Sequence, residues 1–307
     1  MLFGTDYPFL SHDQWLSAWA TLGCSDEITE KVLLGNARAS WASGPNRMSG
    51  TPVPARGELS MEEFHSDGLR LAAHWRRPER VGRVPALVLV PGFPRGTGGA
   101  AMVGATYALL VDRIPRETGW AAMTFTFRGT GASEGDFSIE GWLADVRAAI
   151  DAVGARPDVT GVCIAGFRLG GTLAVVSAGN DERVRGVASF AAPASLREWV
   201  RDPAWFLEYA RRTGVLRTPG YPSDPVAWTR AIATLDPLDA AARIAPRPWM
   251  IVHGSDDDVV PVENAHTLAE AAGDGCELRI VEHGAHRLRH DPRAIALLLG
   301  WLARQSP

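Results

Sequence analysis

The apolar positions of this chain fall into short continuous runs, separated by stretches in which apolar residues recur every three or four positions. The continuous runs predict strands buried on both faces of a parallel sheet, and they span residues 85–90, 120–127, 161–165, 186–190, 248–253 and 277–281. The periodic stretches predict amphipathic helices over residues 100–116, 139–153, 169–178, 262–272 and 292–304. Strands alternating with helices favour an α/β fold, with a mostly parallel twisted sheet and helices on both faces.

Two segments depart from this alternation. Residues 59–66 and 69–75 flank Asp67-Gly68 and predict an antiparallel hairpin that opens the sheet. Residues 193 to about 244 have a helical pattern, and we expect them to form a helical cap inserted between two strands and folded over the strand ends. This segment is rich in aromatic residues, which are Trp199, Trp205, Phe206, Tyr209, Tyr221 and Trp228.

The pattern before the hairpin predicts a separate N-terminal region. Residues 1–42 are typical of a short strand followed by two helices, and residues 43–57 hold several Pro and Gly with little apolar pattern. We therefore predict a fragment over residues 1–42, a linker over residues 43–57 and one main domain over residues 58–307.

Composition narrows the classes of partner. Apolar residues make up 46% of the chain and charged residues 21%, and the net charge of −4 favours neither nucleic acid nor an anionic membrane as a partner. The three cysteines, Cys24, Cys163 and Cys276, are far apart and argue against a disulfide framework and a zinc site. We expect a cytoplasmic protein that needs no metal or cofactor and binds a small molecule. Its oligomeric state stays open.

The most informative stretch is a buried strand pattern that runs into a glycine-flanked turn and then into a helix. Gly166 and Gly170 flank the turn, with Arg168 at its centre. Residues 58 to about 305 resemble the α/β-hydrolase superfamily, in particular its esterase-like and serine-aminopeptidase-like members with a helical cap. The resemblance rests on motifs in the order of that superfamily: Val90–Pro94, Arg128–Gly135, Gly166–Gly170, His253–Pro261 and Gly284–His286.

The resemblance implies roles for particular residues. The acid of a catalytic triad corresponds to Asp257 and the base to His286, and backbone N–H groups of Phe93 and Leu169 correspond to an oxyanion hole. The position of the nucleophilic serine corresponds to Arg168. Neighbouring residues compete for the acid and base positions, namely Asp256, Asp258, His283 and His290, and the acidic run also fits a plain solvated loop.

Arg168 changes the chemistry that the resemblance implies, because a guanidinium stays protonated and cannot attack a carbonyl carbon. Ser133, Thr172 and Cys163 do not replace it, since they belong to another loop, a packed helix face and a strand interior. Whether the chain is an enzyme therefore stays open at this stage.

Three functional hypotheses follow. In the first, serine-type ester or amide hydrolysis is lost or altered, and Arg168 binds a small ligand such as a carboxylate or phosphate. The alternative role for Arg168 is an ion pair with Asp257 that plugs an abandoned site. In the second, His286 and Asp257 act as a general base without a covalent intermediate, as in a hydrolase or lyase. In the third, the chain is a non-catalytic scaffold that binds a partner through helices carrying Trp15 and Trp19.

Residues 1–42 resemble the C-terminal end of the amidohydrolase TIM-barrel proteins, on the motifs Gly4-Thr5-Asp6-Tyr7-Pro8 and Gly35-Asn36-Ala37. In that family the aspartate matching Asp6 lies in the active site. The remaining residues of such a site would lie on earlier barrel strands, so we expect no amidohydrolase activity. We interpret this stretch as a fusion remnant or as the product of a start codon placed too late.

Overall fold

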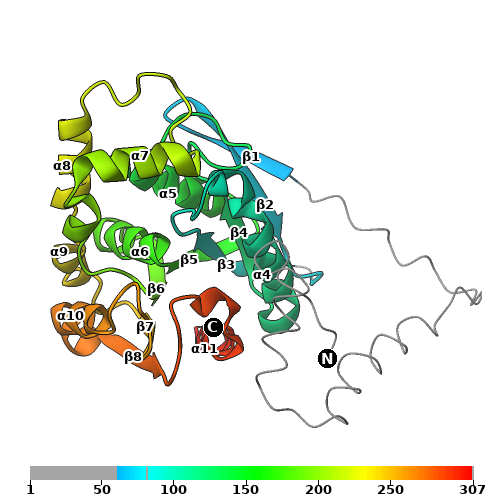
Figure 1. The fold of residues 1–307 in the computed structure, drawn as a ribbon. Coiled ribbons are helices and arrows are strands. Elements are labelled where there is room, and N and C mark those ends of the chain that lie inside the picture. The colour runs from blue at the N-terminus through cyan, green and yellow to red at the C-terminus, as the bar shows by residue number, and fades with distance from the viewer. Residues whose placement is uncertain (1–60, 81, 306–307) are drawn as a thin grey trace, which may run out of the picture. The chain divides into compact units, whose positions relative to one another are not determined.

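An eight-stranded sheet forms the centre of the computed structural model, which describes residues 61–80 and 82–305 (Figure 1). The strands lie in the order β1-β2-β4-β3-β5-β6-β7-β8. β2 runs antiparallel to both of its neighbours, and every pair from β4 to β8 is parallel. The strands are β1 (Met61–Ser66), β2 (Leu69–Arg76), β3 (Val84–Val90), β4 (Ala121–Phe125), β5 (Val159–Phe167), β6 (Val184–Phe190), β7 (Trp249–Gly254) and β8 (Cys276–Val281).

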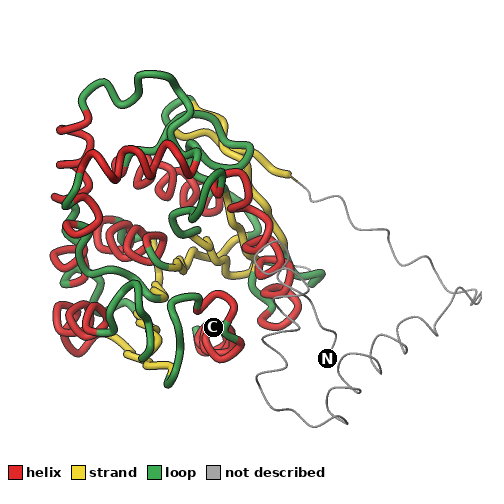
Figure 2. The backbone as a smooth tube through the Cα atoms, viewed as in Figure 1, coloured by secondary structure: helices red, strands yellow, loops and turns green. Residues whose placement is uncertain are grey.

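Helices cover both faces of this sheet (Figure 2). α4 (Val103–Thr118) and α11 (Pro292–Arg304) pack on one face, while α5 (Ile139–Gly154), α6 (Leu169–Asn180) and α10 (Glu263–Ala272) pack on the other. Within β3, Val88 belongs to the core under α5 and α6, and its neighbour Leu89 belongs to the core under α4 and α11. A strand buried on both faces must be apolar at every position, which explains the continuous apolar runs in the sequence.

The predicted mostly parallel sheet with helices on both faces is confirmed. The strand and helix bounds differ from the predicted ranges by a few residues at most, as expected for element ends that fray. The largest difference at a helix start is in the stretch predicted from residue 100, where Gly99–Met102 form a 3-10 turn and α4 begins at Val103.

Between β6 and β7 the chain forms the 3-10 turn η3 (Arg197–Val200) and the helices α7 (Pro203–Thr213), α8 (Pro225–Thr234) and α9 (Pro237–Ala241). Each of the three helices begins with an Asp-Pro pair. The aspartate side chains accept hydrogen bonds from N–H groups of the first turn, and proline occupies the first helical position, where no N–H is needed. This is the segment that the sequence predicts as a cap.

Several hydrogen bonds join this segment to the loop after β4. The Arg217 guanidinium donates to the carbonyl oxygens of Gly131 and Ser133, and the Trp228 indole donates to the carbonyl oxygen of Phe137. The Phe93 ring lies at the centre of the aromatic contacts, with centroid distances of 5.2 to 6.1 Å. Its partners are Phe137, Trp142, Trp199, Phe206 and Tyr209.

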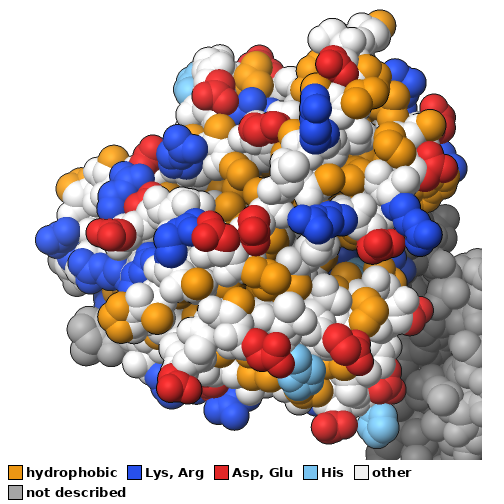
Figure 3. All heavy atoms as spheres, turned by 90° about the vertical axis from the view of Figure 1, so that its left-hand side faces the viewer, with side chains coloured by type: hydrophobic (Ala, Val, Ile, Leu, Met, Phe, Trp, Pro, Cys, Tyr) orange, Lys and Arg blue, Asp and Glu red, His pale blue; other side chains and the backbone are white. Residues whose placement is uncertain are grey.

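The N-terminal predictions lie outside the described residues. This holds for the fragment 1–42, the linker 43–57 and the helices with Trp15 and Trp19. The described residues belong to one compact unit. In the described part of the chain, no helix is both long and apolar enough to span a membrane. On the face drawn in Figure 3, positive and negative side chains are interspersed among apolar ones.

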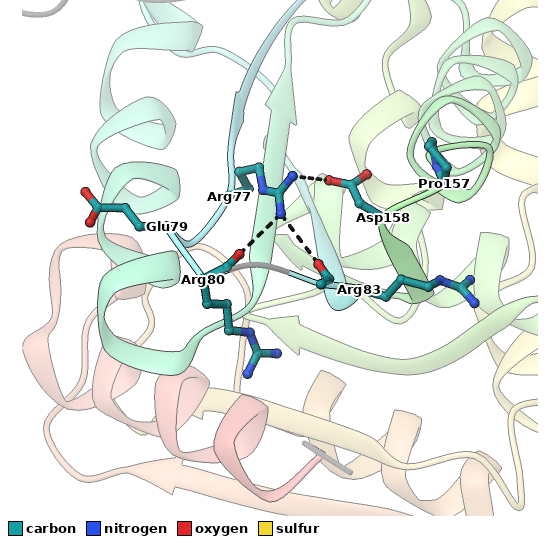
Figure 4. A pocket seen from close by; sticks show the side chains of 7 residues that line it. Arg77, Glu79, Arg80, Arg83, Pro157 and Asp158 are labelled. Atoms are coloured by element: carbon teal, nitrogen blue, oxygen red, sulfur yellow. Dashed lines mark hydrogen bonds and ion pairs between the residues drawn. The ribbon is translucent and has the colours of Figure 1, made fainter.

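A surface hollow lies where the parallel strands begin, at the opposite edge of the sheet from their carboxyl ends (Figure 4). Its centre is Arg77, whose guanidinium pairs with Asp158 at 2.8 Å and donates to the carbonyl oxygens of Arg80 and Gly82. Arg83 donates to the carbonyl oxygen of Val159. These arginines hold the β2–β3 loop against the start of β5, so the hollow has a structural explanation.

Candidate active site

The turn between β5 and α6 has the strained backbone of a nucleophile elbow. Arg168 has φ 58° and ψ −126°, a conformation that costs a non-glycine residue on the order of 1–3 kcal/mol. A side chain at Gly166 would place its Cβ 2.1 Å from the carbonyl oxygen of Gly170, and one at Gly170 would lie 2.3 Å from that of Pro91. The two glycines are therefore required by close backbone contact, and the turn keeps its shape with arginine at its tip.

The loops after β7 and β8 bring Asp257 and His286 together. The Nδ1 atom of His286 lies 2.9 Å from both carboxylate oxygens of Asp257, so Nδ1–H donates to the carboxylate. Both side chains are buried. The Nε2 atom of His286 is buried and has no hydrogen-bond partner among the described residues. This leaves Nε2 with a lone pair, as a general base requires.

Asp257 is held as a carboxylate by its surroundings. Burial raises its pKa, but hydrogen bonds from His253 and His286 and from the backbone N–H groups of Val259 and Val260 outweigh that effect, and the pKa lies below the ordinary aspartate value. His253 Nε2 lies 2.8 Å from the carbonyl oxygen of Val260 and 3.5 Å from Asp257. The imidazole of His253 thus supports the acid from behind, a role that the sequence did not reveal.

The competing residues lie elsewhere. Asp256 and Asp258 are exposed, and Asp256 accepts from the hydroxyl of Ser255 and contacts the exposed His283 at 3.3 Å. His290 is exposed and contacts the guanidinium of Arg289. Among these acids and histidines, Asp257 and His286 are the buried, directly bonded pair.

The two expected oxyanion donors follow β3 and β5. Phe93 comes three residues after the end of β3, and Leu169 is the first residue of α6. Within residues 61–80 and 82–305, neither of their N–H groups donates to a protein acceptor. Parallel pairing of β3 with β5 places both residues at the same edge of the sheet.

The Arg168 side chain extends over the loop that carries Phe93. Its Cβ and Cδ atoms lie 3.4 and 3.7 Å from the Cβ position that a side chain at Gly92 would have, and its Nη1 atom donates to the carbonyl oxygen of Phe93 at 3.3 Å. The hypothesis of an Arg168–Asp257 ion pair is wrong, because no carboxylate of the described residues lies within 4 Å of this guanidinium. The physical reason is that the oxygens of Asp257 are already occupied by His286 and by backbone N–H groups.

Other cations surround Arg168. Burial and the positive charges of Arg95 and Arg289 lower its pKa to about 10, partly offset by Tyr107 and Tyr209. At neutral pH the guanidinium remains charged. Sequence reasoning missed Arg95 and Arg289, because no motif marks them and only the fold brings them to the turn.

The other candidate nucleophiles have structural roles. The Ser133 hydroxyl donates to the carbonyl oxygen of Thr126 and accepts from the N–H of Ala72. The Thr172 hydroxyl donates to the carbonyl oxygen of Pro193. Cys163 is buried in β5, where desolvation raises its pKa to about 12. The sequence analysis excluded all three as nucleophiles, and each of them is packed in the structure.

The arginine-glycine loop after β4 also has a structural role. Arg128 donates from Nε and Nη2 to the fully buried Asp145 on α5, and from Nη2 to Ser66 and Asp67 at the β1–β2 turn. This buried ion pair holds the loop against α5 and against the first hairpin. Among the described residues, no group of three or more His, Cys, Asp or Glu side chains is arranged to hold a metal ion.

Models of two protein families match different parts of this chain. The model of the X-Pro dipeptidyl-peptidase (S15) family matches residues 67–223, slightly more than half of the chain. The model of an amidohydrolase family matches residues 1–42, the stretch that carries the barrel-like motifs.

Two individual relatives are less than 30% identical to this chain. The uncharacterized protein YfhR of Escherichia coli O157:H7 is 27% identical over 234 residues, which cover 74% of this chain and 72% of YfhR. The human mitochondrial palmitoyl-protein thioesterase ABHD10 is 23% identical over 221 residues, which cover 68% of this chain and 69% of ABHD10. The solved structure of Est1E from Butyrivibrio proteoclasticus with bound ferulic acid has a TM-score of 0.61 at 19% identity, covering 79% of this chain and 96% of Est1E. That likeness confirms the expected fold.

Proposed function

Since the chain belongs to the X-Pro dipeptidyl-peptidase (S15) family of α/β-hydrolases, we propose that it is a member in which binding of a small anion has replaced serine-type acyl transfer. The anion is a carboxylate or phosphate, and Arg168 is its main contact. The chain has residues at the proposed acid, base and oxyanion-donor positions, which are Asp257, His286, Phe93 and Leu169.

One observation carries this proposal. The elbow keeps its strained backbone and its two required glycines, yet its tip holds a partly buried guanidinium that has only the Phe93 carbonyl oxygen as an acceptor among the described residues. The Nε atom of Arg168 is buried and without a partner in the same part of the chain. A buried N–H of a charged group left without an acceptor is costly, and a planar guanidinium matches the two oxygens of a carboxylate or phosphate.

The loss of acyl transfer is tested by restoring the nucleophile. A fluorophosphonate probe that modifies activated serines is expected to leave the native protein unlabelled, because Arg168 offers no oxygen. Arg168→Ser is expected to label, since the proposal gives Asp257, His286 and the N–H groups of Phe93 and Leu169 the roles of acid, base and oxyanion donors. His286→Ala in the Arg168→Ser background is expected to remove that labelling. Labelling of the native protein on a serine of this site would refute the proposal.

A second candidate function has its own observation. The buried lone pair on His286 Nε2, oriented by Asp257, suits a general base that activates water without a covalent intermediate. Removing the serine from a triad leaves some rate above water through oxyanion binding. The two functions are separated by His286→Ala tested on p-nitrophenyl esters of short acids. Turnover that depends on His286 supports the catalytic alternative, and turnover unchanged from the native level supports anion binding alone.

A further inference from the structure

Three arginines follow the carboxyl ends of three parallel strands, β3, β5 and β8. Arg168 is at the elbow, Arg95 lies two residues after Phe93, and Arg289 lies in η5 (Leu288–His290), three residues after His286. A chain of contacts joins Arg168 to Arg289. The Cδ atom of Arg168 packs at Gly92, the N–H of Gly92 donates to the Tyr107 hydroxyl at 2.9 Å, and the guanidinium of Arg289 lies 4.8 Å from the centre of the Tyr107 ring.

None of the three arginines pairs with a carboxylate in the described part of the chain. Arg168 contacts the Phe93 carbonyl oxygen, and Arg289 contacts the Nε2 atom of His290 at 2.9 Å. The Nε atoms of Arg168 and Arg289 are both buried without a hydrogen-bond partner there. Other arginines of the interior have full sets of acceptors: Arg128 pairs with Asp145 and Arg76 with Asp112, and Arg247 donates to four backbone carbonyl oxygens.

We propose that this cluster binds the dianionic phosphate of a phosphate monoester, with Arg95, Arg168 and Arg289 as its ligands. The inference rests on the proposed anion-binding function and specifies its ligand. Three guanidinium charges without a counter-charge exceed the single charge of a carboxylate, whereas a phosphate monoester carries about −1.5 to −2 and offers three acceptor oxygens. The N-terminus of α6, at Leu169, adds the partial positive charge of a helix end.

The position of the cluster supports the same ligand. Arg95 is exposed, while Arg168 and Arg289 are partly buried. An anion that entered along these arginines would reach the unpaired Nε atoms of Arg168 and Arg289.

The proposal is tested by calorimetric titration of the full-length protein at pH 7.5 with inorganic phosphate, phenyl phosphate and acetate. We expect both phosphates to bind at least about tenfold more tightly than acetate. Arg95→Gln and Arg289→Gln are each expected to weaken phosphate binding about tenfold or more, as loss of one charge-assisted contact implies. Arg80→Gln is the matched control, because Arg80 is an exposed arginine at the opposite edge of the sheet, and it is expected to have no effect.

The outcomes distinguish the three-arginine phosphate site from the more general anion-binding function. Equal affinity for phosphate and acetate, or phosphate binding unchanged in Arg95→Gln and Arg289→Gln, would overturn the three-arginine site. If Arg168→Gln alone weakened both anions, the proposed function would stand without this site. If no anion bound the native protein, both would fall. Should Arg289→Gln fail to fold, Arg289→Lys, which keeps the charge, is expected to fold and to retain most of the phosphate affinity.

Discussion

Replacing Arg168 with glutamine is expected to stabilise the ligand-free protein. Burial and neighbouring cations lower the pKa of this guanidinium to about 10, below its ordinary value of about 12.5. At about 1.4 kcal/mol per pKa unit, the charge costs the folded state up to about 3 kcal/mol. Because Arg168 is partly exposed and its surroundings can relax, we expect Arg168→Gln to raise the free energy of unfolding by about 1–3 kcal/mol.

The sign follows from linkage. The folded pKa of Arg168 is lower than the unfolded one, so the arginine is protonated in both states at pH 7 and the destabilisation is fully present there. It would be relieved only as the pH rises through about 10. Arg168→Lys is the matched control, because it keeps a cation on the same strained backbone, and we expect its stability to stay within about 1 kcal/mol of the native value.

The measurement is urea unfolding followed by circular dichroism in a buffer without phosphate or sulfate. Arg168→Gln should shift the midpoint upward without changing the slope. Adding phosphate at about 100 times its Kd should then stabilise the native protein by about 2.7 kcal/mol and stabilise Arg168→Gln by clearly less. If the free energy of unfolding of Arg168→Gln did not exceed those of the native protein and of Arg168→Lys, the charge would be compensated within the fold. The reasoning from an unpaired guanidinium would then be wrong.

Three further predictions concern the scaffold. Gly170→Ala should destabilise the protein by more than about 3 kcal/mol in the same urea assay, because the new Cβ would lie 2.3 Å from the Pro91 carbonyl oxygen. The control is Gly300→Ala in α11, whose new Cβ meets nothing closer than 3.8 Å and which should stabilise the protein by up to about 1 kcal/mol. Equal effects of the two substitutions would contradict the close contact at Gly170. Because the pKa of Asp257 is lowered in the folded state, its carboxylate stabilises the fold above about pH 4, and this contribution is lost as the pH falls. Asp257→Asn should therefore lose less stability than the native protein between about pH 5 and pH 2. An equally steep loss of stability in Asp257→Asn would count against this explanation. Cys163, with its pKa raised to about 12, should stay unmodified by iodoacetamide at pH 8 in the native protein and react in urea, as read by peptide mass spectrometry; rapid native modification would mean that β5 opens.

Much of the fold could be predicted because its signals are local. A strand such as β3, buried on both faces, must be apolar at every position, and a helix that packs on a sheet must repeat its apolar residues every three or four positions. The Asp-Pro starts of α7, α8 and α9 are likewise local, since the cap and the missing N–H satisfy the first turn of the same helix. Arg168, Asp257 and His286 could be selected as candidate site residues for the same reason, because short motifs mark the loops that hold them.

The partners of the Arg168 side chain could not be predicted from the sequence. We expected an ion pair with Asp257 as one interpretation, but Asp257 is saturated by His253, His286 and backbone N–H groups, and Arg168 contacts the Phe93 carbonyl oxygen instead. A long side chain can reach several acceptors within a few ångströms, and which one it contacts depends on groups already bonded to one another.

By itself, the amino-acid sequence determined a parallel sheet with helices on both faces, the glycine-flanked turn after β5 and the absence of a nucleophilic oxygen at its tip. These features depend on residue type, spacing and backbone contact, which are written in order along the chain. Only the tertiary structure decided that Arg95 and Arg289, 73 and 121 residues from Arg168 in the sequence, share its electrostatic environment. Coulomb interactions depend on distance through space, so the folded chain sets them and sequence spacing does not.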